Sequence, residues 1–202
     1  MLAMKWFQAA LLSAVLVQGA AAANVNVNIS ANPQAALPKN TVFPTDGQFT
    51  QNYDNGARKL LAHFKNGLLD GELTRWFDNG NKAQELHFVG GKLHGMGMMW
   101  YKNGQPFSEK HFEHDVEHGT STAWYENGQK KQELTMKHGE IVTQITWDKQ
   151  GKLTSEFSLQ QGKRTGVALG WYENGNKRSE RVFENGELIL EQSWDENGEL
   201  IQ

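Results

Sequence analysis

A short motif recurs seven times along the chain and constrains the fold more than any other feature. It consists of an aromatic residue, or Asp in the degenerate copies, followed by a variable residue and usually Asn-Gly. The copies end at Gly56, Gly80, Gly104, Gly128, Gly151, Gly175 and Gly198. These glycines are 24, 24, 24, 23, 24 and 23 residues apart, and six of the seven tryptophans lie four residues before one of them. A fixed period of this length is the mark of a repeat protein.

Each repeat predicts a β-hairpin. An apolar residue falls eight positions after each of the first six anchor glycines, and a second turn follows. Asn-Gly is a strong hairpin signal because both residues tolerate a positive φ, and the runs between turns have ordinary strand length. Phe88 and Leu86 should share one face, opposite His87 and Glu85. The seven copies therefore predict an all-β antiparallel meander of about thirteen or fourteen strands, with no helix.

Two units are one residue shorter than the others. Four units carry a further glycine after the second turn, and Asp115 replaces the turn glycine of the third unit. The further glycine is missing in the two shorter units, where Thr143 and Leu190 take its place. We expect a hairpin loop shortened by one residue to explain both facts.

The repeat resembles a known family. The pattern Lys-x-x-Glu-x-x-Phe-x-x-Gly-x-x-x-Gly-x-x-x-x-Trp-Tyr-x-Asn-Gly is carried best by residues 82–104, 130–139 and 171–186. It is similar to the MORN-repeat variant of bacterial proteins, many of which are labelled antitoxins (the YwqK-like group). The resemblance covers residues 53–198 and implies an elongated single-layer sheet of 23–24-residue β-hairpin repeats that acts as a scaffold or partner-binding surface. It implies no catalytic residues.

The N-terminal part differs from the repeats. Residues 1–23 have a basic Lys5, an apolar run and an alanine-rich end, which predicts a secretory signal peptide. Its removal changes the formal net charge from −3 to −4 and places the mature protein in the periplasm or outside the cell. Residues 24–50 read as a short strand (24–29) followed by a proline-rich linker, and residues 51–202 as the repeat domain. No later stretch is long enough to span a membrane.

Composition and motifs argue against several kinds of chemistry. The chain has no cysteine, which excludes disulfides and thiolate-bound metals. Its slight negative charge argues against nucleic-acid binding. It contains neither a G-x-S-x-G motif nor a P-loop. We therefore expect a non-enzymatic protein without a cofactor.

Histidines and glutamates recur at equivalent positions of successive repeats, called columns, which suggests a metal site and a pair of catalytic carboxylates as two hypotheses. His111, His114 and His118, with acidic residues between them, are weak candidates for a metal site. Repeat duplication explains the clustering equally well, because equivalent positions lie about 9.5 Å apart, two strands away. Glu85, Glu109, Glu133, Glu156 and Glu180 are more consistent with a solvated ladder, paired with Lys110, Lys131 and Arg181, than with catalytic carboxylates.

The aromatic column is the candidate binding surface. Its tryptophans either stack and stabilise a thin sheet or remain exposed as a binding stripe. The residues selected are Trp76, Met96, Met98, Met99, Trp100, Trp124 and Trp171. The expected partner is another protein, with an antitoxin- or immunity-like role by resemblance; the alternative is an envelope glycan or lipid surface. The oligomeric state stays open.

Overall fold

A computed structural model describes residues 37–38 and 41–201 of the chain. The predicted signal peptide (1–23) and the predicted strand at 24–29 lie outside the described residues. The described part contains no helix and therefore none that could cross a bilayer. Its strands are β1 (Gly47–Asn52), β2 (Arg58–Lys65), β3 (Leu68–Trp76), β4 (Lys82–Val89), β5 (Lys92–Leu93), β6 (Gly95–Trp100), β7 (Pro106–Glu113), β8 (Val116–Glu117), β9 (Gly119–Trp124), β10 (Lys130–Lys137), β11 (Glu140–Trp147), β12 (Leu153–Gln160), β13 (Lys163–Trp171), β14 (Lys177–Glu184) and β15 (Glu187–Ser193).

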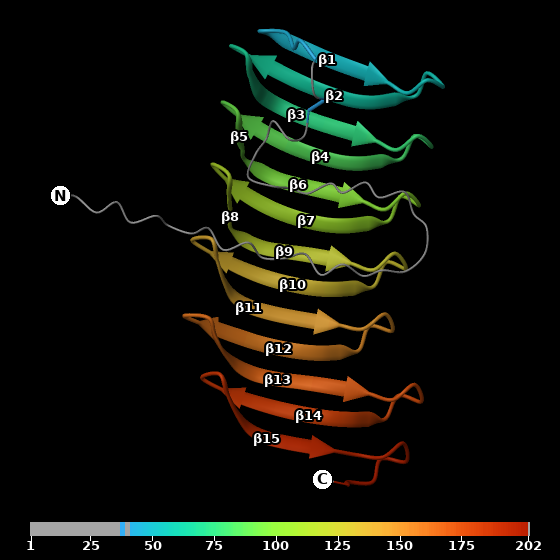
Figure 1. Ribbon diagram of the computed structural model, residues 1–202, viewed down its shortest axis with the longest axis vertical. Coiled ribbons are helices and arrows are strands. Elements are labelled where there is room, and N and C mark those ends of the chain that lie inside the picture. The colour runs from blue at the N-terminus through green and yellow to red at the C-terminus, as the bar shows by residue number, and fades with distance from the viewer. Residues whose placement is uncertain (1–36, 39–40, 202) are drawn as a thin grey trace, which may run out of the picture.

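All strands belong to one antiparallel sheet that follows chain order (Figure 1). The continuous path runs β1-β2-β3-β4-β6-β7-β9-β10-β11-β12-β13-β14-β15, while the short β5 and β8 pair with β4 and β7. The strands are stacked along the long axis of the molecule, so consecutive repeats lie side by side (Figure 1). The predicted all-β meander of hairpin repeats is confirmed.

The hairpin turn inside each unit has two central residues, both with positive φ. Asn66 and Gly67, at +52° and +75°, are typical. This is the turn whose twist matches that of antiparallel strands. His114 and Asp115 adopt the same conformation, at +51° and +72°, which explains how Asp115 replaces glycine. Asp is among the few residues that tolerate this region.

The anchor turns are of a different type from the one expected. In the second unit only Gly80 has a positive φ, +88°, whereas Asn79 does not. The Gly80 N–H donates to the Phe77 carbonyl at 3.0 Å, and the Phe77 N–H donates to the Asn81 carbonyl at 2.8 Å. This pattern closes a three-residue loop ending in a left-handed glycine. The expectation that both Asn and Gly have positive φ is therefore wrong for the anchors.

The missing residue of the shorter units comes from a β-bulge and not from the turn. Pairing of β2 with β3 passes from Phe64↔Leu69 to Ala62↔Leu73, which leaves two extra residues on β3. Pairing of β10 with β11 passes from Met136↔Ile141 to Thr135↔Thr143, which leaves one extra residue on β11. Both hairpins keep two central turn residues. The predicted shortened loop is corrected to a smaller bulge.

The repeat begins inside the stretch assigned to the linker. Gly47 at the start of β1 has a φ of +103°, and Gly71 at the matching place in β3 has +102°. The Gly67 N–H donates to the Thr45 carbonyl at 2.7 Å, just as the Gly91 N–H donates to the Leu69 carbonyl at 2.7 Å. Residues 45–56 are thus the second half of a repeat, and their strand β1 stands first in the order of the sheet.

One face of the sheet carries the apolar core and is called the phenylalanine face. Its buried residues are Leu60, Ala62, Phe64, Leu69, Leu73, Leu86, Phe88, Leu93 and Phe112. Phe43, ahead of β1, stacks on Phe64 with ring centroids 5.3 Å apart. Toward the C-terminus only Phe157 is buried among the described hydrophobic residues beyond Phe112. The core therefore lies mainly in the N-terminal half of the sheet.

Candidate functional site

The opposite face of the sheet, called the tryptophan face, carries the aromatic column. Alternation places Trp76 on the side opposite Arg75, and Trp100 on the side opposite Met99. All members are half-buried, so each indole is partly accessible. They are Trp76, Trp100, Trp124, Trp147, Trp171 and Trp194. The structure thus combines both predicted roles, packing and exposure.

Cationic side chains lie over five of these rings. Four of the cations come from the first strand of the same repeat as their tryptophan, and Lys152 directly precedes that strand. Such contacts contribute about 0.5–1 kcal/mol each at exposed sites. The cation-to-centroid distances are 5.4 Å for Arg58–Trp76, 5.7 Å for Lys82–Trp100, 5.7 Å for Lys130–Trp147, 4.9 Å for Lys152–Trp171 and 4.3 Å for Lys177–Trp194. In the third unit Pro106 lies opposite Trp100, the place that Lys82 has opposite Trp76. Proline therefore replaces the cation in the repeat of Trp124.

Three of these lysines also pair with the glutamate column. Lys82 bonds to Glu85, Lys130 to Glu133 at 2.7 Å and Lys177 to Glu180 at 2.6 Å. The predicted pairing with Lys110 and Arg181 is wrong, because Lys110 bonds to Glu117 and Arg181 to Glu191. Lys110 and Arg181 directly follow column glutamates, so they point to the opposite face. Three glutamates of the column therefore pair with three of the five cations that cover the indoles.

The tyrosines of the anchors fix the edge of the tryptophan face. Each of the chain's four tyrosines donates its hydroxyl to the carbonyl of the tryptophan in the next repeat. The distances are 2.7 Å for Tyr53–Trp76, 2.8 Å for Tyr101–Trp124, 3.0 Å for Tyr125–Trp147 and 2.8 Å for Tyr172–Trp194. Burial raises the pKa of the Tyr53, Tyr101 and Tyr125 hydroxyls above the ordinary 10.0, so these donors stay protonated at neutral pH.

The anchor asparagines make a second ladder beside the tyrosines. The Asn127 side-chain amide donates to the Lys149 carbonyl at 2.9 Å, and its oxygen accepts from the Gln129 N–H at 3.1 Å. Four other anchor asparagines make the same two bonds: Asn55, Asn79, Asn103 and Asn174. Sequence reasoning assigned these asparagines to turns and missed that they join one repeat to the next.

The methionines selected from the sequence divide between the two faces. Met96 and Met98 lie on the tryptophan face with Trp100, and Met96 is 42% exposed. Met99 lies on the phenylalanine face and is buried. Met96, Met98 and Trp100 therefore form one accessible apolar patch on β6, and Met99 is not part of it.

The histidine candidates are not gathered into a metal site. His111 lies on β7, where its Nδ1 is 3.1 Å from the Thr120 carbonyl. His114 lies in the hairpin turn, and its nearest aromatic neighbour is His94, with ring centroids 5.5 Å apart. His118 lies between β8 and β9. Across residues 37–38 and 41–201, no three His, Asp or Glu side chains are placed to hold a metal ion.

The phenylalanine face carries polar atoms that are covered. Arg75 Nε, Gln84 Oε1 and Ser108 Oγ are buried without a hydrogen-bond partner in the described part of the chain. Desolvation lowers the pKa of the Arg75 guanidinium. These three atoms are out of contact with solvent, whereas the described residues place no second layer over the tryptophan face.

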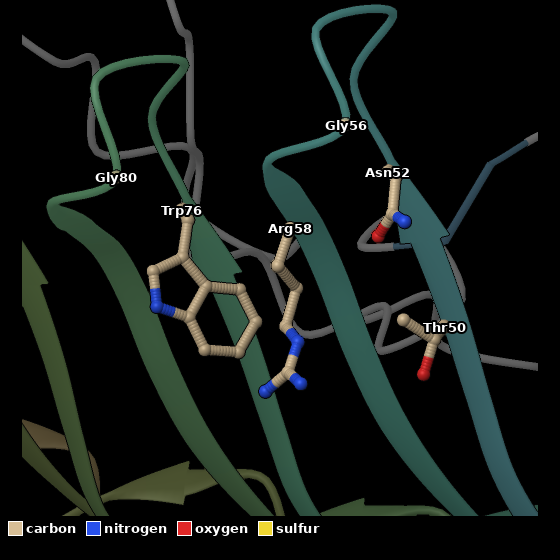
Figure 2. Close-up of a pocket in the computed structure, with 6 residues that line it drawn as sticks. All are labelled: Thr50, Asn52, Gly56, Arg58, Trp76 and Gly80. Atoms are coloured by element: carbon tan, nitrogen blue, oxygen red, sulfur yellow. The ribbon is translucent and has the colours of Figure 1, made fainter.

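A shallow pocket lies at the N-terminal end of the tryptophan face. Figure 2 shows the Arg58 side chain from β2 extending beside the Trp76 ring, with Asn52 and Thr50 on β1 to its other side. Gly56 and Gly80 in the two flanking anchor turns complete the lining. Asn52 of β1 lies opposite Arg58 of β2, and at the equivalent position of the next repeat Trp76 of β3 lies opposite Lys82 of β4. Asn52 therefore occupies the place of a tryptophan, which leaves space beside Arg58.

Comparison with known proteins agrees with this architecture. Residues 69–89, 117–138 and 164–185 match the MORN repeat variant family. Each match runs from the second strand of one hairpin, through an anchor turn, into the first strand of the next. No curated protein matches the chain.

Proposed function

We propose that this protein is a non-enzymatic scaffold whose tryptophan face binds another protein. The observation that carries the proposal is the row of half-buried indoles, flanked by cations and by the Met96–Met98 patch, on a face over which the described residues place no second layer. Contiguous exposed apolar surface usually marks an interaction site. Aromatic residues and methionine are enriched in such sites.

The proposal includes export to the cell envelope. Residues 1–23 have the composition of a signal peptide, and the absence of cysteine is compatible with an oxidising compartment. Mass spectrometry of protein recovered from the envelope should find an N-terminus near Asn24. Retention of residues 1–23, or recovery only from the cytoplasm, would exclude export.

The proposed partner is a protein of the same compartment. By resemblance to the repeat family, binding would sequester that partner in an antitoxin- or immunity-like manner; this is an analogy at the level of the fold. An exported protein would not meet a cytosolic toxin, so the partner is sought in envelope extract. If the purified partner inhibits growth and this protein relieves that inhibition, the result would support sequestration.

The test is a quantitative binding measurement on a partner captured from envelope extract. Met96→Glu and Met98→Glu introduce a charge into the apolar patch, and each should weaken binding by about tenfold or more. Leu188→Glu is the matched control, because Leu188 is 48% exposed and lies on the opposite face. Equal affinity of all three variants would contradict the tryptophan face as the binding surface. Pelleting with peptidoglycan or liposomes, without a protein partner, would instead favour the surface-binding alternative.

A further inference from the structure

The pocket beside Arg58 lies where the pattern of the tryptophan face is incomplete. Lys82, Lys130 and Lys177 each lie over a tryptophan and each bond to a glutamate three residues further on. Lys152 has no such glutamate but donates to the Gly175 carbonyl at 2.7 Å. Arg58 lies over Trp76, yet the position three residues further on is Leu61. No ion pair involves Arg58 in the described part of the chain.

Compared with the repeats that contain Lys82, Lys130 and Lys177, the pocket therefore lacks a carboxylate. A guanidinium binds a carboxylate through two parallel N–H···O bonds, which are stronger than bonds between neutral groups. The Asn52 amide and the Thr50 hydroxyl, on the strand beside Arg58, supply further donors. The indole of Trp76 offers an apolar wall against which the carbon chain of an acidic group can lie.

The position of the pocket favours an extended peptide as the bearer of that carboxylate. In the order of the sheet β1 stands first, and β2 is its one neighbouring strand among the described residues. The outer backbone groups of an edge strand are a template for pairing with another chain. Binding by strand addition uses these groups for affinity and side-chain pockets for specificity. A sugar has no such backbone pattern to offer.

We propose that the pocket formed by Thr50, Asn52, Arg58 and Trp76 binds an acidic side chain of an extended partner peptide that pairs with β1. The proposal rests on the protein-binding function proposed above and adds the chemistry of one contact. The carboxylate gives Arg58 the opposite charge that Glu85 gives Lys82. The two glycines, Gly56 and Gly80, keep the approach from the anchor turns clear of side chains.

The test is an NMR titration of the full mature chain with two synthetic peptides. Both are acetylated and amidated strands of alternating threonine and valine; one has a central glutamate and the other a central glutamine. The glutamate peptide should shift the Arg58 Nε–H, the Trp76 indole N–H and the β1 amides, and should bind about tenfold more tightly, a difference of about 1.4 kcal/mol. Equal affinities, or no saturable shift at about 5 mM peptide, would overturn the proposal.

Two variants and one sugar separate the remaining explanations. Arg58→Gln should lower the affinity for the glutamate peptide to that for the glutamine peptide. Circular dichroism should show an intact sheet, because Arg58 is exposed. Arg181→Gln, on the opposite face and at the other end of the sheet, should change nothing. If digalacturonic acid shifts the NMR signals of the pocket residues and neither peptide does, the peptide proposal would be overturned and the ligand would be an acidic glycan. If Arg58→Gln binds the captured partner with unchanged affinity while Met98→Glu loses affinity, the pocket would be rejected and the proposed function would still stand.

Discussion

Single residues in this chain make contacts that depend on the identity of the side chain and that recur in several repeats. The hydroxyl that distinguishes Tyr101 from Phe77, at the same repeat position, adds a bond to the Trp124 carbonyl. Where Asp148 stands in the tyrosine position, its carboxylate accepts from the Gln150 and Lys152 N–H groups, each at 2.9 Å. The degenerate anchor therefore keeps its turn by a different bond. At this scale the most restrictive position is Gly166.

Replacing Gly166 by alanine should destabilise the protein more than replacing a turn glycine. A Cβ on Gly166 would lie 2.0 Å from the Glu156 carbonyl oxygen, so the backbone of β12 or β13 would have to move. We expect the free energy of unfolding to fall by about 3 kcal/mol or more, as measured by urea denaturation. In the control, Gly162→Asn, the φ of +76° suits asparagine and no atom lies within 4 Å. That variant should lose less than about 1 kcal/mol; equal losses would contradict the steric argument.

The repeat element is a hairpin that is bonded to its neighbours at both ends. At the anchor end, the tyrosine and asparagine side chains reach the next repeat. At the other end, turn amides such as the Gly186 N–H donate back to the preceding repeat, in this case to Arg164 at 2.8 Å. The strands between them are joined by the sheet ladder. Each repeat is thus held by bonds that only an adjacent repeat can supply.

Raising the pH should weaken the anchor end selectively. Burial raises the pKa of the Tyr101 hydroxyl above 10.0, so the folded protein binds this proton more tightly than the unfolded chain. Its contribution to stability is complete below pH 10 and is lost as the pH rises through the folded-state pKa. Ultraviolet titration of tyrosinate should show midpoints above pH 10 for Tyr53, Tyr101 and Tyr125. Tyr101→Phe should cost about 1 kcal/mol at pH 8 and less at high pH; a cost independent of pH would argue against the bond.

The whole molecule is a single sheet whose stability should vary along its length. The buried side chains of the phenylalanine face are concentrated between Leu60 and Phe112, and Phe43 packs on their N-terminal end. Strand β15, at the other end, exposes Leu188, Ile189 and Leu190 on both faces. Single-layer repeat arrays have no second layer to even out such differences.

Hydrogen exchange should reveal this gradient. Amides in β2, β3 and β4 should exchange about a hundredfold more slowly than those in β15, because opening the former exposes the core and opening the latter removes one edge strand. Mass spectrometry of peptic fragments measures both ends in one experiment, and the intermediate strands serve as the internal control. Uniform protection from β2 to β15 would show that the sheet opens as one unit.

The sequence by itself determined the two long strands of each repeat from β2 onward, their order and their faces. The spacing of the anchor glycines, the period-two alternation and the turn residues are local signals, and pairing of consecutive strands follows from them. The all-β meander and the sides of Phe88, Trp100 and Met99 could therefore be predicted. The half-repeat at 45–56 could also have been found, from Thr45-Asp46-Gly47 and its likeness to Leu69-Asp70-Gly71, but it lacks the tryptophan used to align the repeats.

The tertiary structure decided what touches what between repeats. Whether an anchor asparagine, besides its bond within the turn, also reaches the next repeat depends on distances between strands that no local pattern encodes. The same holds for whether Glu133 pairs with Lys130 or with Lys131. The bulges shift the register by one or two residues and so set which side chains meet. The pocket beside Arg58 exists for the same reason: Asn52 is unremarkable in the sequence and becomes informative only because β1 places it where the other repeats have tryptophan.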